Sequence, residues 1–156
     1  MTSILALLPL ACAAPGPVGT IPWAPSMPLA MERAAAEERA LFVFFHAPWC
    51  GVCQRMKAEV FTDPEVLLGL LAYVPVSVDI DEWPHLAEKY HVEAVPMVAV
   101  LSPGGQILRL AVGGLDRTQL RSFLAVPEGD GAVVTPSPAG TGRGLFPSVH
   151  PGEVNG

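Results

Sequence analysis

Apolar residues follow two different periods between residues 28 and 126. Segments in which they recur every three or four positions, among Ala, Glu and Arg, predict helices over 28–40, 50–61, 61–72, 82–91 and 115–126. Continuous or alternating apolar runs predict strands over 41–47, 73–81, 96–102 and 106–112. The last two strands are separated by Pro103-Gly104-Gly105, a combination typical of a hairpin turn.

The order of these elements predicts the layers of the fold. Two strand–helix–strand units come first, and a hairpin with a final helix follows. This order favours an α/β class with a mixed central sheet that helices cover on both faces. In such sheets chemistry tends to gather at the carboxyl ends of the strands. The end of the 41–47 strand is therefore the first place to look for a site.

The two ends of the chain differ from this middle part. Residues 1–27 carry no charged side chain: an apolar run at 4–11 is followed by a stretch rich in proline. We interpret 1–27 as an export leader and linker, 28–126 as one domain, and the Gly- and Pro-rich 127–156 as disordered. The leader is either cleaved after a small-x-small motif at 11–13 or lipid-anchored through Cys12. An unprocessed N-terminus on a cytoplasmic protein is the alternative.

Composition limits the classes of partner. The chain has 156 residues, 51% of them apolar and 15% charged, with a net charge of −6. That length suits one domain with its own core, and no apolar run is long enough for a confident transmembrane helix. Its nine cationic residues are scattered, whereas phosphate binding needs clustered Lys and Arg. We therefore expect no nucleic-acid partner.

The chemistry concentrates in Cys50 and Cys53, two of the chain's three cysteines, within the stretch "WCGVC". A C-x-x-C spacing occurs in zinc sites, haem attachment motifs, structural disulfides and redox-active dithiols. Zinc needs about four ligands, and the third cysteine and the four histidines form no second pair. Haem attachment needs a histidine where Gln54 stands, and a disulfide closing so short a loop stabilises little. A redox-active dithiol is therefore the interpretation of Cys50 and Cys53 that the sequence supports best. We expect no metal and no cofactor.

Several blocks of sequence around this pair resemble the thioredoxin fold. They occur in the family's order and at about its spacing: Ala47–Cys53, Val78–Asp81, Tyr90–Pro96 and Val112–Leu115, followed by Gln119-Leu120 and Phe123-Leu124. The stretch "FTDPEV" at 61–66 is similar to the thioredoxin-like domain of the bacterial membrane reductant conduit (the DsbD type) and its exported relatives. The resemblance covers about 30–125 and implies a thioredoxin fold for that part of the chain.

The resemblance also implies roles for individual residues. Cys50 would be the nucleophile at a helix N-terminus, where an anion is favoured, and Cys53 the resolving thiol. Pro96 would follow a cis peptide bond and face the dithiol, leaving the backbone of Val95 free to pair with an extended substrate. The remaining substrate-binding positions are Trp49 and Gly113.

Three positions depart from the family pattern. Phe44 stands where many members carry a buried acid, and Ser77 stands where a lysine is common. Val52 replaces the proline of typical cytosolic thioredoxins, which argues against a general cytosolic role. How protons reach Cys53 is therefore open. His46 is either a proton-relay group or a packed histidine.

Together these observations predict a thiol–disulfide oxidoreductase that acts on protein disulfides, more as a reductase than an oxidase. Its partners would be disulfide-containing proteins and a membrane or soluble dithiol donor. We expect it to be exported, in a bacterial periplasm or as a membrane-anchored lipoprotein. The alternative is a non-enzymatic binding or chaperone module, or a carrier that uses Cys50 and Cys53 to deliver Cu(I).

Overall fold

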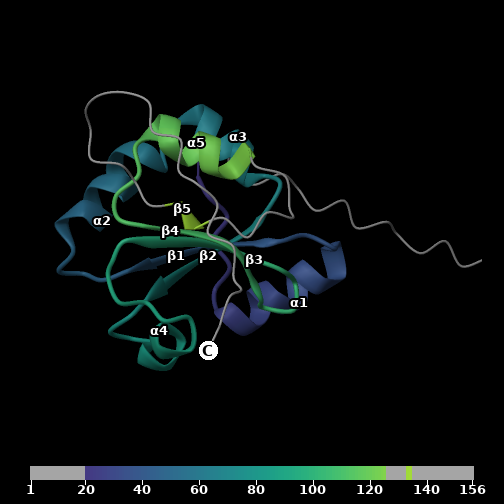
Figure 1. Ribbon diagram of the computed structural model, residues 1–156. Helices are drawn as coiled ribbons and strands as arrows, with labels where there is room; N and C mark the ends of the chain where they lie inside the picture. The colour runs from purple at the N-terminus through teal and green to yellow at the C-terminus, as the bar shows by residue number, and fades with distance from the viewer. Residues whose placement is uncertain (1–19, 126–132, 135–156) are drawn as a thin grey trace, which may run out of the picture.

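The computed structural model of the chain describes residues 20–125 and 133–134 (Figure 1). Its helical elements are α1 (Met27–Glu37), α2 (Gly51–Arg55), the π-helix η1 (Met56–Val60), α3 (Pro64–Leu70), α4 (Pro84–Lys89) and α5 (Arg117–Ala125). The strands are β1 (Leu41–His46), β2 (Val74–Asp79), β3 (Met97–Leu101), β4 (Ile107–Val112) and β5 (Val133–Val134).

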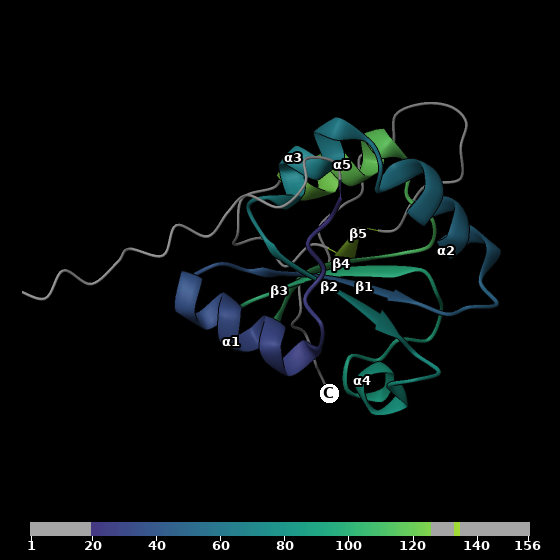
Figure 2. The ribbon, with the colours of Figure 1, turned by 180° about the vertical axis from the view of Figure 1, so that it is seen from behind.

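The strands form one mixed sheet in the order β2-β1-β3-β4-β5. β1 runs parallel to β2 and antiparallel to β3, β3 pairs antiparallel with β4, and β4 pairs parallel with β5. Both views show α2, α3 and α5 on one face of the sheet and α1 and α4 on the other (Figures 1 and 2). The sheet and its two helical layers confirm the predicted α/β architecture.

β1 is buried along its whole length because both faces of the sheet are covered. Phe42 and Phe44 belong to the apolar cluster that also contains Cys53. Val43 and Phe45 belong to the cluster on the opposite face, beneath α1. The strand that leads to the dithiol is therefore held rigidly from both sides, as its continuous apolar sequence predicts.

Local capping fixes where α3 begins. The Oδ1 of Asp63 accepts hydrogen bonds from the backbone N–H groups of Glu65, at 3.0 Å, and Val66, at 3.2 Å. Pro64 occupies the first turn, where its missing N–H has no intrahelical partner to lose. Asp63 and Pro64 therefore start α3 as a new helix, separate from the helical run that begins at the dithiol and ends at Val60.

The helical run after the dithiol differs from the regular helix predicted over 50–61. It begins as α2 and widens into η1, where the N–H of Phe61 donates to the carbonyl of Met56, five residues earlier, at 3.0 Å. The other predicted helices are also shorter than expected: α3 and α5 occupy only parts of 61–72 and 115–126. α1 ends before the predicted residue 40 because Glu38 adopts a left-handed conformation (φ 51°), and α4 spans only part of 82–91.

Two residues of the segment predicted to be disordered lie in the sheet. Val133 pairs with Leu110 and Val134 with Ala111, so β5 adds a parallel strand beside β4. An edge strand offers unpaired N–H and C=O groups, and valine favours extended backbone, which explains this departure from the prediction. The rest of 127–156 lies outside the described residues, and so does the part of the predicted leader and linker that contains Cys12, residues 1–19; residues 20–27 are described, and Ala24 forms a bridge with Val76 of β2.

None of the helices within 20–125 is both long enough and apolar enough to cross a membrane.

Candidate functional site

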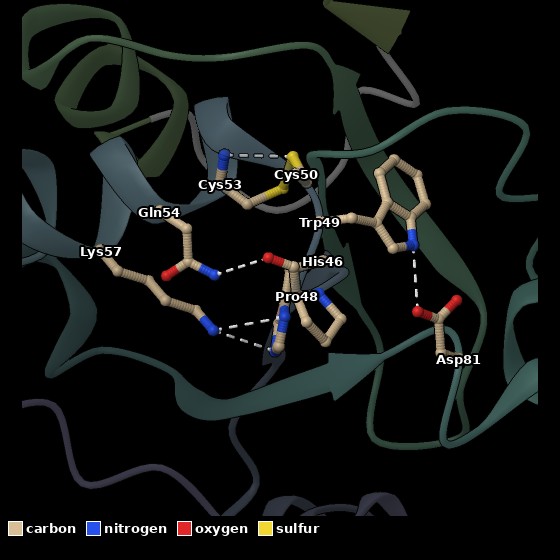
Figure 3. The surroundings of a disulfide bond; sticks show 8 residues. All are labelled: His46, Pro48, Trp49, Cys50, Cys53, Gln54, Lys57 and Asp81. Carbon is tan, nitrogen blue, oxygen red and sulfur yellow. Dashed lines mark hydrogen bonds between the residues drawn. A yellow bond between two sulfur atoms is a disulfide. The ribbon is translucent and has the colours of Figure 1, made fainter.

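Cys50 and Cys53 form a disulfide at the point where β1 gives way to α2, with their Cα atoms 5.2 Å apart (Figure 3). Cys50 is the N-cap residue of α2, and its Sγ accepts a hydrogen bond from the backbone N–H of Cys53 at 3.1 Å. The exposed fraction of Cys50 is 6%, and that of Cys53 is 0%. One sulfur thus borders the surface at a helix N-terminus, while the other is enclosed in the core.

The Val95–Pro96 peptide bond is cis, as the resemblance implies. The carbonyl of Pro96 accepts a hydrogen bond from the backbone N–H of Gly113 at 2.8 Å. Gly113 has a φ of 103°, a conformation that residues with a Cβ rarely adopt. The hydrogen bond therefore joins the start of β3 to the loop after β4 and brings together Pro96 and Gly113, two of the predicted substrate-binding residues.

The loop after β4 approaches Val52 through Gly114, which belongs to the Val112–Leu115 block but was not among the predicted site residues. A Cβ added to Gly114 would lie 2.5 Å from Cγ1 of Val52, which stands between the two cysteines. Only a residue without a side chain fits this approach unless Val52 moves. A double glycine after a strand is the signal that could have pointed to it.

Trp49 lies on the surface beside the disulfide, with 68% of its side chain exposed. Its indole N–H donates a hydrogen bond to Oδ2 of Asp81 at 3.0 Å, which ties the residue before Cys50 to the loop that follows β2 (Figure 3). Val52 and Val112 are also exposed apolar residues. The sequence analysis did not assign Asp81 to the site.

Two of the three positions that depart from the family pattern, Phe44 and Ser77, lie on β1 and β2. Phe44 is fully buried and pairs in register with Ser77, so neither residue supplies an ionisable group to the core. The imidazole of His46 stacks on the ring of Phe44, with centroids 5.3 Å apart. The Nζ of Lys57, from η1, lies 3.3 Å from Nδ1 of His46. A basic pair thus occupies the region next to Phe44.

Burial and neighbouring charges shift the pKa values of His46 and Lys57. Burial lowers the pKa of His46 below its usual 6.5; the Lys57 ammonium lowers it further, and Asp79 acts in the opposite direction. Burial also lowers the pKa of Lys57 from 10.5, again against the pull of Asp79. His46 is therefore the neutral partner and Lys57 the charged one near pH 7.

Metal binding needs several ligands at one place. Within residues 20–125 and 133–134, no three or more His, Cys, Asp and Glu side chains gather in a group that could hold a metal ion.

The comparisons with known proteins agree with this arrangement. A relative from Synechococcus elongatus, "Thiol:disulfide interchange protein TxlA", is 29% identical over 93 residues, covering 60% of this chain and 49% of the relative. The chain thus spans about half the length of this curated relative. The solution structure of a thioredoxin from Thermus thermophilus is 33% identical with a TM-score of 0.58, covering 63% of this chain and 80% of that one.

A third comparison concerns the fold alone. The C-terminal domain of DsbD from Neisseria meningitidis, in its oxidised form, is 23% identical with a TM-score of 0.51, covering 60% of this chain and 86% of that one. The family model described as a thioredoxin-like domain matches residues 27–126, which is the whole of the predicted domain, 28–126, and the one residue before it. With the dithiol opening α2 and the cis proline at the start of β3, this match shows that the chain belongs to the thioredoxin-like domain family.

Proposed function

We propose that the chain is a thiol–disulfide oxidoreductase that exchanges disulfides with other proteins through Cys50 and Cys53. The observation that carries this proposal is the asymmetry of the pair: Cys50 caps α2 close to the surface, and Cys53 is fully buried. A thiolate at a helix N-terminus is favoured, so Cys50 is the sulfur suited to attack a substrate.

The reaction proceeds in two exchanges. The Cys50 thiolate attacks one sulfur of the substrate disulfide, forming a mixed disulfide and releasing a substrate thiolate, which takes a proton from solvent. The Cys53 thiolate then attacks the Cys50 sulfur, which releases the second substrate thiolate and forms the Cys50–Cys53 disulfide. Two electrons pass from the protein dithiol to the substrate, and a donor dithiol restores the reduced pair by the reverse exchanges.

The substrate in this proposal is an extended segment of a protein. Trp49 and Val52 flank Cys50 in the sequence, Val112 precedes Gly113, and all three are exposed apolar residues. The backbone of Val95, ahead of Pro96, is suited to pair with such a segment as an added strand. Gly113 supports that arrangement by its hydrogen bond to Pro96.

We further infer that the protein acts as a reductase, is exported, and is recharged by a membrane or soluble dithiol donor. The leader-like sequence of 1–27 supports export, with Cys12 as the site of a lipid anchor if the leader is not simply cleaved. The name of the Synechococcus elongatus relative, a thiol:disulfide interchange protein, supports the reaction class.

The experiment that tests the proposal measures both activity and direction. The reduced protein should reduce the disulfides of insulin in the presence of dithiothreitol, and the Cys50→Ser variant should not. Equilibration with glutathione or dithiothreitol redox buffers should give a reduction potential closer to about −270 mV, typical of a reductant, than to about −120 mV, typical of an oxidant. Absence of insulin reduction by the wild-type protein would overturn the reaction class, and a potential near the oxidant value would overturn the direction.

A further inference from the structure

In the resolving step Cys53 must react as a thiolate, although its side chain is buried among apolar residues. Cys53 has no exposed surface and belongs to the same cluster of buried residues as Phe44 and Met56. Burial in apolar surroundings raises the pKa of a thiol, because the thiolate loses its hydration. A nearby positive charge is the simplest means by which this chain could offset that cost.

Lys57, which forms a basic pair with His46, supplies such a charge on the face of the sheet where Phe44 and Cys53 lie. Lys57 follows Cys53 by four residues in one continuous helical run, the spacing at which side chains of a helix are neighbours. Its Nζ lies 5.9 Å from the centroid of the Phe44 ring, so the lysine side chain extends inward along the core surface. Figure 3, which draws the surroundings of the disulfide, shows the end of the Lys57 side chain at the imidazole of His46.

His46 holds the lysine in this position. The Nζ of Lys57 lies 3.3 Å from Nδ1 and 3.4 Å from Nε2 of the imidazole. A neutral imidazole accepts a hydrogen bond from an ammonium group, and the stacking of His46 on Phe44 fixes the plane of its ring. Among the described residues, the charged groups that act on His46 are Lys57 from η1 and Asp79 from β2.

We propose that the Lys57 ammonium, held in place by His46, stabilises the Cys53 thiolate that resolves the mixed disulfide. This inference rests on the proposed function and assigns Lys57 and His46 as positioning residues for its second step. In that step Cys53 loses its proton to solvent, its sulfur bonds to Sγ of Cys50, and the bond from Cys50 to the substrate sulfur breaks. The substrate leaves as a thiolate.

A small neutral disulfide, 2,2′-dithiodipyridine, separates the two steps. Mixed with an excess of reduced protein, it should release one pyridinethione as Cys50 attacks and a second as Cys53 resolves the adduct. Stopped-flow absorbance follows both phases, and the second phase is unimolecular. Its dependence on pH reports the ionisation of Cys53 in the mixed disulfide.

The matched variants are Lys57→Met, which removes the charge and keeps the length, and Lys57→Arg, which keeps the charge. If Lys57→Met raises the pKa of Cys53 by about one unit, the thiolate fraction near pH 7 falls about tenfold. A more basic thiolate is about threefold more nucleophilic for that change, so the second phase should slow about threefold. At alkaline pH, where Cys53 is ionised in both proteins, the deficit should disappear and reverse, with the more basic thiolate of Lys57→Met reacting about threefold faster.

The remaining arms of the experiment separate this inference from its alternatives. Lys57→Arg should resemble the wild type, and His46→Phe, which keeps an aromatic ring on Phe44 but removes the acceptor, should show part of the deficit. The first phase should be unchanged in all variants. If both phases occur in the wild type and Lys57→Met leaves the pH profile of the second phase unchanged, Lys57 does not stabilise the Cys53 thiolate. The assignment as an oxidoreductase then stands. If the wild type shows neither phase, both are overturned.

Discussion

The indole N–H of Trp49 donates to the carboxylate of Asp81 across 3.0 Å, joining the residue before Cys50 to the loop that follows β2. Trp49 is largely exposed, so packing alone does not fix its orientation. The hydrogen bond keeps the indole beside the disulfide, where it forms part of the proposed substrate surface.

Removal of this acceptor should affect protein substrates more than small ones. We expect Asp81→Ala to lower insulin turnover by up to about fivefold, equivalent to about 1 kcal/mol for one hydrogen bond. Asp81→Asn keeps an acceptor oxygen and should retain most of the activity. The reaction with 2,2′-dithiodipyridine, which is too small to need the indole surface, should be unaffected. Equal insulin turnover by Asp81→Ala and the wild type would show that the contact does not order Trp49 for substrate.

The close approach of Gly114 to Val52 predicts a specific cost for a side chain at residue 114. The added methyl group of Gly114→Ala would collide with Cγ1 of Val52, 2.5 Å away, and overpacking of this kind costs about 1–3 kcal/mol. Val52→Ala removes the colliding atom. The double variant should therefore recover much of the lost stability, as measured by urea unfolding of the oxidised protein. Additive losses in the double variant would mean that the two residues do not meet as described.

Much of this site follows from the sequence, and the exceptions have physical causes. The C-x-x-C pair and the buried strand before it carry strong local signals, because each depends on residue type and spacing. The cis bond before Pro96 was predicted only through the family resemblance. The contacts of Gly114 with Val52 and of Trp49 with Asp81 join segments far apart in the chain, and no periodicity encodes them.

Three other features were not predicted from the sequence, for reasons of packing. The wide turn of η1 has the same apolar spacing as an ordinary helix, so the pattern over 50–61 predicted a regular one. The pairing of β5 depends on the free edge of β4, whereas the composition of 127–156 indicated only disorder. The partner of His46 could not be read from the sequence because Lys57 lies on a different element.

The depressed pKa of His46 predicts a pH dependence of stability. Its folded-state pKa lies below the usual 6.5 because of burial and then the Lys57 charge, so the unfolded chain binds the proton more readily. The resulting stability is present above pH 6.5 and is lost as the pH falls from there through the folded-state value. The free energy of unfolding of the wild type should decline over this range.

The matched control for this decline is His46→Phe, which cannot take up the proton and should show a flatter profile there. Glu37 contributes in a different window: Arg33 and Arg39 lower its pKa from 4.5, so its effect is lost only as the pH falls below that value. Urea unfolding at a series of pH values measures both windows. Identical profiles for the wild type and His46→Phe above pH 4.5 would contradict the buried, neutral state assigned to His46.

The central claim is that Cys50 attacks and Cys53 resolves, and trapping the intermediate tests it most directly. Cys53→Ser removes the second exchange but leaves the Cys50 thiolate at the head of α2, so mixed disulfides with substrate proteins should accumulate in the cell. They should appear on a non-reducing gel as extra bands that vanish with reductant, and Cys50→Ser should give few or none. Equal trapping by both variants, or no trapping by either, would contradict the account.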